Sequence, residues 1–170
     1  MDQSYNNAIE QLKVLLDSID KNNENDCKRI KNYFEWVTLK TSIIQSEKQF
    51  DISDEDRKLI RRGNVLWVNF GFNIGSEFGG HHPAIIIRRM GNGVYVIPLD
   101  SGKVPDDKKD KKYYIDVPYV YGFSKVPRHC NIYKMLCIDP RRIDFNNING
   151  SVNGKVLDKI SDALKSHQIY

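Results

Sequence analysis

The sequence has few cysteines and no long apolar run. Its three cysteines, Cys27, Cys130 and Cys137, show no Cys-x-x-Cys spacing, so we expect reduced thiols and no disulfide framework. No apolar run approaches the roughly 18 residues that span a bilayer. The opening residues, MDQSYNNAIEQ, lack the basic and apolar segments of a secretory signal. We therefore expect a cytoplasmic protein with no membrane segment.

Several motifs of enzymes and cofactor sites are also missing. The sequence contains no HExxH, no Walker loop and no nucleophile elbow. His129 and His167 lie at spacings that are not typical of metal ligands. We therefore expect no cofactor and no metal site.

The chain is 40% apolar and 28% charged, as in globular proteins, and its charge is uneven. Residues 1–60 carry 9 Lys or Arg and 12 Asp or Glu, a balance of −3, whereas residues 61–170 carry 17 and 10, a balance of +7. A basic body behind an acidic head suits a domain that binds a polyanion. A solvated surface with uneven charge is the alternative.

The first 60 residues are expected to form a helical extension. Apolar residues recur every three or four positions from Ile9 to Ile19 and again from Ile30 to Ile44, on either side of a polar break at 21–26. These stripes predict two helices that form a hairpin and pack on the body or on another subunit. Ser53 lies three residues before Asp56, a pattern typical of the start of a short helix.

Residues 61–170 are expected to form a separate domain that is mainly β. Short segments rich in β-branched and aromatic residues predict strands at 64–70, 83–90, 93–99, 113–120 and 130–138. MGNG at 90–93 predicts a hairpin turn, and helical spacing returns at 152–167. About five short strands and a closing helix predict a small, strongly curved antiparallel barrel.

Four motifs stand in order within this second part. They are RRGNVLWVNFGFNIGSEFGGHHPAIII (61–87), VYVIPLDSGK (94–103), MLCIDPRRID (135–144) and the terminal helix. With these motifs, residues from about 62 to 164 resemble the MazF/PemK family of bacterial toxins. The resemblance implies an SH3-like barrel of the CcdB/MazF type, usually a homodimer. It also implies metal-independent cleavage of single-stranded RNA, with a cognate antitoxin whose extended tail occupies the RNA groove.

The resemblance points to catalytic residues at two places. The family's catalytic arginine, just before a proline, falls on His82, and its catalytic threonine falls on Asp100, with Ser101 next to it. An imidazole can act as base or acid near neutral pH, which typically contributes 10²–10⁴-fold. Asp100 can orient His82 and raise its pKa, and Ser101 can donate a hydrogen bond to a phosphate oxygen.

Other residues are predicted to contact the substrate. Glycines in the first long loop allow it to move over the groove, and Phe78 can stack on a base or belong to the core of a closed loop. His81 points away from His82 if the strand has already begun, because side chains alternate along a strand. The predicted substrate-binding residues are Arg62, Glu77, Phe78, Gly80, His81, Arg88 and Arg128.

The residues leave alternatives open. His82 can instead cap a loop through backbone hydrogen bonds, and residues 100–102 can form a plain turn. The whole domain can be a binding module that has lost cleavage and binds RNA or a protein, including a CcdB-like protein that acts on a topoisomerase. The helical extension can complete the domain by packing, extend a dimer interface, dock an antitoxin, or cover the groove as a built-in inhibitor.

Overall fold

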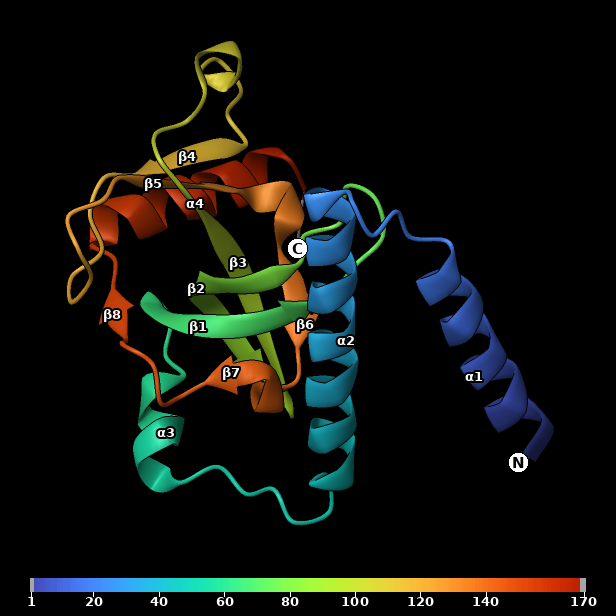
Figure 1. The fold of residues 1–170 in the computed structure, drawn as a ribbon. Coiled ribbons are helices and arrows are strands. Elements are labelled where there is room, and N and C mark those ends of the chain that lie inside the picture. Colours follow the sequence, from blue (N-terminus) through green and yellow to red (C-terminus); the bar gives the residue numbers. More distant parts are fainter. Residues whose placement is uncertain (1, 169–170) are drawn as a thin grey trace. The chain divides into compact units, whose positions relative to one another are not determined.

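A computed structural model describes residues 2–168 of the chain (Figure 1). The chain divides into two compact units, Met1–Glu47 and Lys48–Tyr170. This division lies before the boundary that the sequence predicts at residue 60. The reason is that helix α3 (Asp54–Leu59) leads into Ile60, which is buried in the core of the second unit, and Ile52 packs against the same core.

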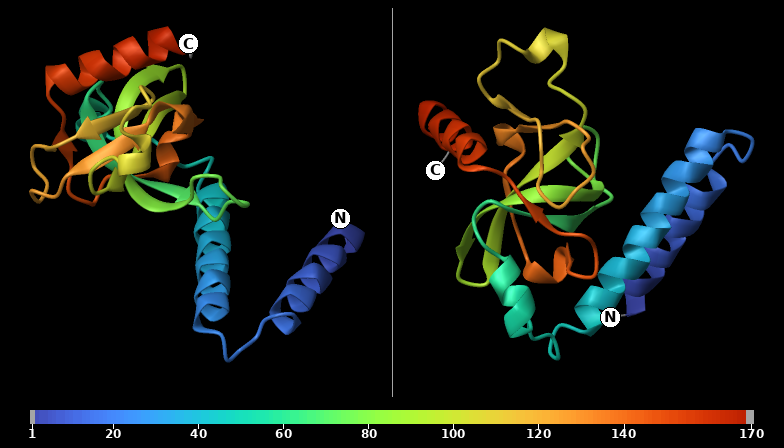
Figure 2. Two further views of the ribbon diagram at one scale, coloured as in Figure 1. Left: turned by 90° about the horizontal axis from the view of Figure 1, so that it is seen from above. Right: turned by 90° about the vertical axis from the view of Figure 1, so that its left-hand side faces the viewer.

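The first unit consists of helices α1 (Asp2–Asp17) and α2 (Glu24–Gln45), which confirms the two predicted helices. Asn23 caps α2, because its side-chain oxygen accepts the N–H of Asn25 at 3.0 Å. The helices diverge from the turn between them and do not pack along their length as a closed hairpin (Figure 2). Within residues 2–168, no helix combines the length and the apolar character needed to cross a membrane.

The second unit is built on an eight-stranded sheet whose pairings are all antiparallel. The sheet has the order β4-β5-β3-β2-β1-β7, while β6 pairs with β3 and β8 pairs with β1. The strands are β1 (Asn64–Gly71), β2 (Gly80–Met90), β3 (Gly93–Ser101), β4 (Tyr114–Val117), β5 (Arg128–Asn131), β6 (Leu136–Ile138), β7 (Ile143–Asp144) and β8 (Gly150–Ser151).

The predicted barrel is not closed in the described part of the chain. The mainly β class is confirmed, together with the N-terminal helices and the C-terminal helix. However, the short strands β4 and β7 end the strand order and do not pair with each other. The curvature comes from β3, whose first half pairs with β6 and whose last residues pair with β5. The correct description is therefore a strongly curved open sheet.

The local sequence explains why the predicted hairpin forms and why one predicted strand is interrupted. The hairpin at 90–93 is confirmed, because Met90 pairs with Gly93 and Gly91 has a φ of +57°. The strand predicted over 130–138 is interrupted by a 3₁₀ turn, η2 (Ile132–Lys134). The side chain of Asn131 starts this turn by accepting the N–H of Tyr133 at 3.0 Å. The turn is important because it places Lys134 at the candidate site.

The sheet carries an apolar core on each face. Helix α4 (Gly154–Ser166) covers one face, where Ile160 lies among Val65, Ile85 and Ile97. The other face is filled by Ile60 and by a second set of buried side chains, among them Leu66, Val68, Phe70, Ile86 and Val96. Successive residues of a strand therefore point into different cores, and this alternation decides which of the predicted site residues can meet.

Candidate active site

Strand pairing brings His82, Asp100 and His129 to one face of the sheet. The β2–β3 ladder ends at the pair Ala84↔Pro98, and His82 and Asp100 each lie two residues beyond it. On the other side of β3, Asp100 pairs directly with His129. Because side chains two apart share a face, the three groups lie in line across the ends of three strands. The structure thus brings together His82 and Asp100, two of the three predicted catalytic residues.

Asp100 is held between two basic groups. The ammonium nitrogen of Lys134 lies 3.7 Å from Oδ2 of Asp100, and Nε2 of His129 lies 4.0 Å from the same oxygen. Nδ1 of His129 is 3.1 Å from the carbonyl oxygen of Gly102. Since a carbonyl only accepts, Nδ1 carries the proton, and Nε2 is the nitrogen that faces Asp100. The ammonium group of Lys134 therefore places positive charge beside the carboxylate.

His82 is half-buried beneath an aromatic side chain. The Phe78 ring meets the imidazole edge to face, with the centroids 4.9 Å apart, and Lys134 lies 4.8 Å from the centre of the Phe78 ring. Burial lowers the pKa of His82 below its usual value of 6.5, and the negative charge of Asp100 partly opposes this, while His81 and Lys134 lower the pKa further. The imidazole is therefore neutral near pH 7.

His81 and Ser101 lie on the opposite face of the sheet. Nε2 of His81 is 3.2 Å from Oδ2 of Asp144, and its ring lies 4.9 Å from that of Trp67. Ser101 directly follows Asp100 on β3 and is exposed, so alternation turns it away from His82. The predicted divergence of the two adjacent histidines is confirmed. Ser101 does not join His82 and Asp100 in this structure.

Arg128 is buried at the edge of the first core. Only 9% of this residue is exposed, and its guanidinium carbon lies 5.5 Å from the centre of the Phe123 ring. Burial lowers the pKa of Arg128. The Nε atom of Arg128 and the Nε1 atom of Trp67 are both buried and have no hydrogen-bond partner among the described residues. Arg128 pairs with Ser101 in the ladder and so lies on the face away from His82.

The other predicted arginines also lie apart from His82. Arg62 donates to the carbonyl of Ile87 at 3.3 Å and to the hydroxyl of Ser161 at 2.8 Å, which ties the start of β1 to helix α4. Arg88 is exposed near the other end of β2. These positions favour a structural role for Arg62. The phosphate contacts predicted for the three arginines stay predictions.

The loop before β2 is closed over the second core. Phe78 packs on Phe70 with the ring centroids 5.0 Å apart, which favours its role as a core residue of a closed loop. Glu77 accepts the N–H of Ile74 at 3.2 Å and so stabilises the turn. Gly80 has a φ of +86°, and a Cβ there would lie 3.1 Å from Nε2 of His82. Only glycine fits this position without moving the imidazole.

Two residues of the cluster, His129 and Lys134, are not predicted as site residues from the sequence. Both are brought to Asp100 by the β3–β5 register and by the turn η2, neither of which the sequence alone specifies. The sequence around Lys134 contains no motif that marks this lysine as a site residue. Among residues 2–168, no group of three or more His, Cys, Asp or Glu side chains is placed to hold a metal ion.

Comparison with known proteins identifies the family to which the chain belongs. The sequence model of the family described as "PemK-like, MazF-like toxin of type II toxin-antitoxin system" matches residues 61–167. This match covers more than half of the chain, so the chain belongs to the PemK-like, MazF-like toxin family. No curated protein matches the chain.

Three solved structures are among those that show similarity to this chain. MazF (Form-I) from Deinococcus radiodurans has a TM-score of 0.49 and 21% identity, covering 63% of this chain and 94% of that chain. The Mycobacterium tuberculosis toxin MazF-mt6 has a TM-score of 0.45 and 13% identity, covering 62% and 94%. The MazE-MazF complex (Form-II) from Deinococcus radiodurans has a TM-score of 0.45 and 18% identity, covering 65% and 98%.

Proposed function

We propose that this chain is a metal-independent endoribonuclease that cleaves single-stranded RNA and is controlled by a cognate antitoxin. Membership of the toxin family supports the class of activity. The observation that carries the proposal is the alignment of His82 with Asp100 and Lys134 at the ends of β2 and β3. These three side chains provide a base, a negative charge that raises the pKa of that base, and a positive charge.

His82 acts as the base in this proposal. The neutral imidazole takes the proton from a ribose 2′-hydroxyl, and the 2′-oxygen attacks the adjacent phosphorus. The bond from phosphorus to the 5′-oxygen breaks, the 5′-oxygen takes up a proton from water, and the protonated imidazole of His82 returns its proton to the solvent. The products are a 2′,3′-cyclic phosphate and a 5′-hydroxyl end. Burial suits His82 to this step, because it lowers the pKa and keeps the imidazole unprotonated near pH 7.

Lys134 makes the presence of Asp100 compatible with an anionic substrate. A carboxylate in the place of the family's threonine repels a phosphate, but the Lys134 ammonium lies 3.7 Å from Oδ2 of Asp100. The pair therefore has little net charge, and Lys134 also offers N–H donors to a phosphate oxygen. Asp100 in turn raises the pKa of His82 against the effect of burial, which limits how weak a base the imidazole becomes.

The remaining parts of the proposal follow from the family. Type II toxins are paired with an antitoxin, and the family name states this relation. We therefore propose a cognate antitoxin as partner, a homodimer as the working form and the cytoplasm as the location. The roles of Ser101 and of the predicted substrate-binding residues remain proposals, although the positions of Arg62 and Phe78 favour structural roles. In the present structure Ser101 has to reorient before it can reach the phosphate that His82 serves.

Purified full-length protein with EDTA tests this function. Single-stranded RNA should be cut into fragments that end in a 2′,3′-cyclic phosphate and begin with a 5′-hydroxyl, as shown by end-group analysis. Induced expression in a bacterium should arrest growth, and co-expression of the neighbouring open reading frame should relieve the arrest. Intact RNA across a broad set of substrates would overturn the proposal.

One observation favours a second candidate function, an RNA-binding module without cleavage. The Phe78 ring lies against His82 with the ring centroids 4.9 Å apart, so it restricts the approach of a substrate from that side of the imidazole. If this ring keeps the phosphodiester away from His82, the surface beside it can bind RNA without proton transfer. Salt-dependent RNA binding without any cleavage would select this candidate.

A further inference from the structure

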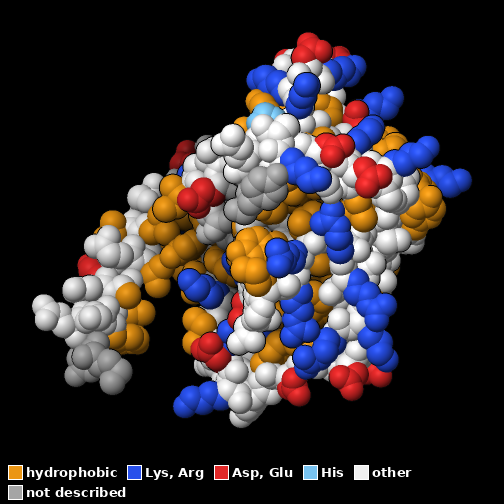
Figure 3. Space-filling model, turned by 180° about the vertical axis from the view of Figure 1, so that it is seen from behind, with side chains coloured by type: hydrophobic (Ala, Val, Ile, Leu, Met, Phe, Trp, Pro, Cys, Tyr) orange, Lys and Arg blue, Asp and Glu red, His pale blue; other side chains and the backbone are white. Residues whose placement is uncertain are grey.

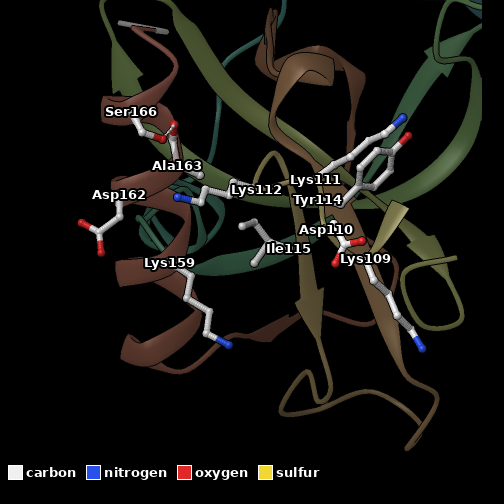
Figure 4. Close-up of a pocket in the computed structure, with 10 residues that line it drawn as sticks. All are labelled: Lys109, Asp110, Lys111, Lys112, Tyr114, Ile115, Lys159, Asp162, Ala163 and Ser166. Carbon is white, nitrogen blue, oxygen red and sulfur yellow. Dashed lines mark hydrogen bonds between the residues drawn. The ribbon is translucent and has the colours of Figure 1, made fainter. Parts of the chain in front are cut away.

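A pocket of about 390 Å³ lies between helix α4 and the segment before strand β4. One wall consists of residues 109–112 with Tyr114 and Ile115, and the other consists of Lys159, Asp162, Ala163 and Ser166 (Figure 4). The volume falls in the range of small-ligand sites, which begins at about 300 Å³. None of these residues belongs to the cluster at His82. The pocket is thus a separate feature of the second unit.

The pocket has more positive charge than its own carboxylates neutralise. Lys109 is paired with Asp106, but Lys111, Lys112 and Lys159 form no ion pair with any of the described residues. Figure 4 shows Lys112 reaching towards helix α4, while Lys111 extends on the other side beside Tyr114. Lys and Arg side chains also gather on the surface of the second unit seen from behind (Figure 3). An anionic ligand is the expected complement of such a site.

Aromatic rings lead from this pocket towards the candidate active site. The ring of Tyr113 lies 4.9 Å from that of Tyr133 and 5.8 Å from that of His167. His167 directly follows Ser166 of the pocket wall, and its Nδ1 lies 2.9 Å from the hydroxyl of Tyr133. Tyr133 is 56% exposed, so a flat group can reach it although the rings of Tyr113 and His167 lie beside it.

The 3₁₀ turn η2 connects the pocket to the candidate active site. Tyr133 and Lys134 are consecutive in η2, and Lys134 lies 3.7 Å from Asp100. On the strand side, the ring of Tyr114 is 6.1 Å from that of His129, which also faces Asp100. Tyr114 thus lines the pocket and also faces His129, and Tyr133 adjoins Lys134, so these two tyrosines lie next to both the pocket and the residues around Asp100. Exposed rings beside unpaired lysines are the features that bind bases and phosphates of a single strand.

We propose that Tyr133 and the pocket with Lys111, Lys112 and Lys159 form a second binding site for the same single-stranded RNA. A base stacks on Tyr133, and the lysines hold the phosphates beyond it. The inference rests on the proposed function in that the strand is the one whose phosphodiester lies at His82. The site adds affinity for RNA longer than the few nucleotides at the cleaved bond and needs no particular sequence.

The test measures binding of the full-length protein to a fluorescent 2′-O-methyl oligouridylate of about 12 nucleotides, a length within the range of single-strand sites. The methyl groups block the 2′-oxygens, so binding is measured whether or not the protein cleaves RNA. Dissociation constants are measured at several salt concentrations for the wild type and for the triple variant Lys111→Gln, Lys112→Gln, Lys159→Gln. The matched control replaces Lys13, Lys21 and Lys28 of the first unit by glutamine.

The triple variant should bind roughly ten-fold more weakly. Its plot of log K against log salt should also be shallower, by about 0.7 for each phosphate that the lysines no longer neutralise. The control variant should bind as the wild type. Tyr133→Ala should weaken binding about ten-fold, whereas Tyr133→Phe, which keeps the ring and removes only the hydroxyl, should not. Circular dichroism melting curves check that each variant is folded.

Equal affinity and salt dependence of the wild type and the lysine variant would overturn the inference, as would a wild type that binds no oligonucleotide. Failure of the second-site inference can be distinguished from failure of the proposed nuclease function. A protein that cleaves RNA but does not use these lysines disproves the second site alone. A protein that binds through them but cleaves nothing supports the second site and disproves the nuclease.

Discussion

The ammonium group of Lys134 lies 3.7 Å from Oδ2 of Asp100 and 4.8 Å from the centre of the Phe78 ring. One side chain thus contacts both the carboxylate that is predicted to stand at the position of the family's threonine and the ring that lies against His82. Lys134 also lowers the pKa of His82 through its charge. This contact explains how an acidic residue can stand at a site proposed to bind a phosphodiester.

Lys134→Gln should reduce RNA cleavage. The variant leaves Asp100 without its neutralising cation, so the carboxylate repels the phosphate and the transition state loses a charged donor. The expected loss in kcat/KM is about 10²-fold, the usual effect of removing one such group. Lys134→Arg keeps the positive charge and should retain most of the activity. Equal rates for Lys134→Gln and the wild type would remove Lys134 from the mechanism.

The pH dependence should follow the neutral form of His82. Burial lowers the pKa of His82 below 6.5, so kcat/KM should rise with pH and reach half its maximum below pH 6.5. Asp100→Asn removes the charge that raises this pKa, so NMR titration of the His82 ring should show a further decrease. A midpoint above pH 6.5 in the wild type would show that burial does not dominate the titration of His82.

The lowered pKa of His82 also makes the stability of the fold depend on pH. Because the folded pKa is lower than the unfolded one, the unfolded chain binds more protons in the window just below pH 6.5. The contribution of His82 to stability therefore decreases as pH falls through this window. Thermal unfolding of the wild type and His82→Ala across the window should show a smaller pH dependence in the variant.

Gly80→Ala should displace the imidazole. Gly80 has a φ of +86°, and the added Cβ would lie 3.1 Å from Nε2 of His82. The strained backbone should cost about 1–2 kcal/mol of unfolding free energy, and cleavage should fall well below what that loss of stability explains. Gly91→Ala is the matched control, since Gly91 also has a positive φ, +57°, but has open space around it. It should lose stability and keep its activity; equal activity losses would disprove the steric account.

The sequence allows much of the fold to be predicted, but less of the site. The hairpin at Gly91 and the apolar stripe of α4 are local features, and local propensity specifies them. The approach of Lys134 and His129 to Asp100 depends on strand register and on a 3₁₀ turn started by Asn131. Such contacts join residues far apart in the sequence, and periodicity carries no information about them.

The unit boundary can be tested by two truncations. Residues 48–170 contain both apolar cores, so this fragment should fold with nearly the melting temperature of the full chain. Residues 61–170, the domain that the sequence predicts, lack Ile60, which is 6% exposed, and Leu59 and Ile52, which pack beside it. Removing Ile60 alone should cost about 1.5–3 kcal/mol. Denaturant unfolding measures both fragments, and equal stability would show that α3 adds nothing to the core.

The central claim is that the imidazole of His82 transfers a proton during RNA cleavage. The most direct measurement is the single-turnover rate of cleavage with EDTA for His82→Ala and, as the matched control, His81→Ala, whose ring faces Asp144 on the other side of the sheet. His82→Ala should lower the rate by about 10²–10⁴-fold, and His81→Ala by less than about ten-fold. A folded His82→Ala protein that cleaves RNA at the wild-type rate would contradict the account.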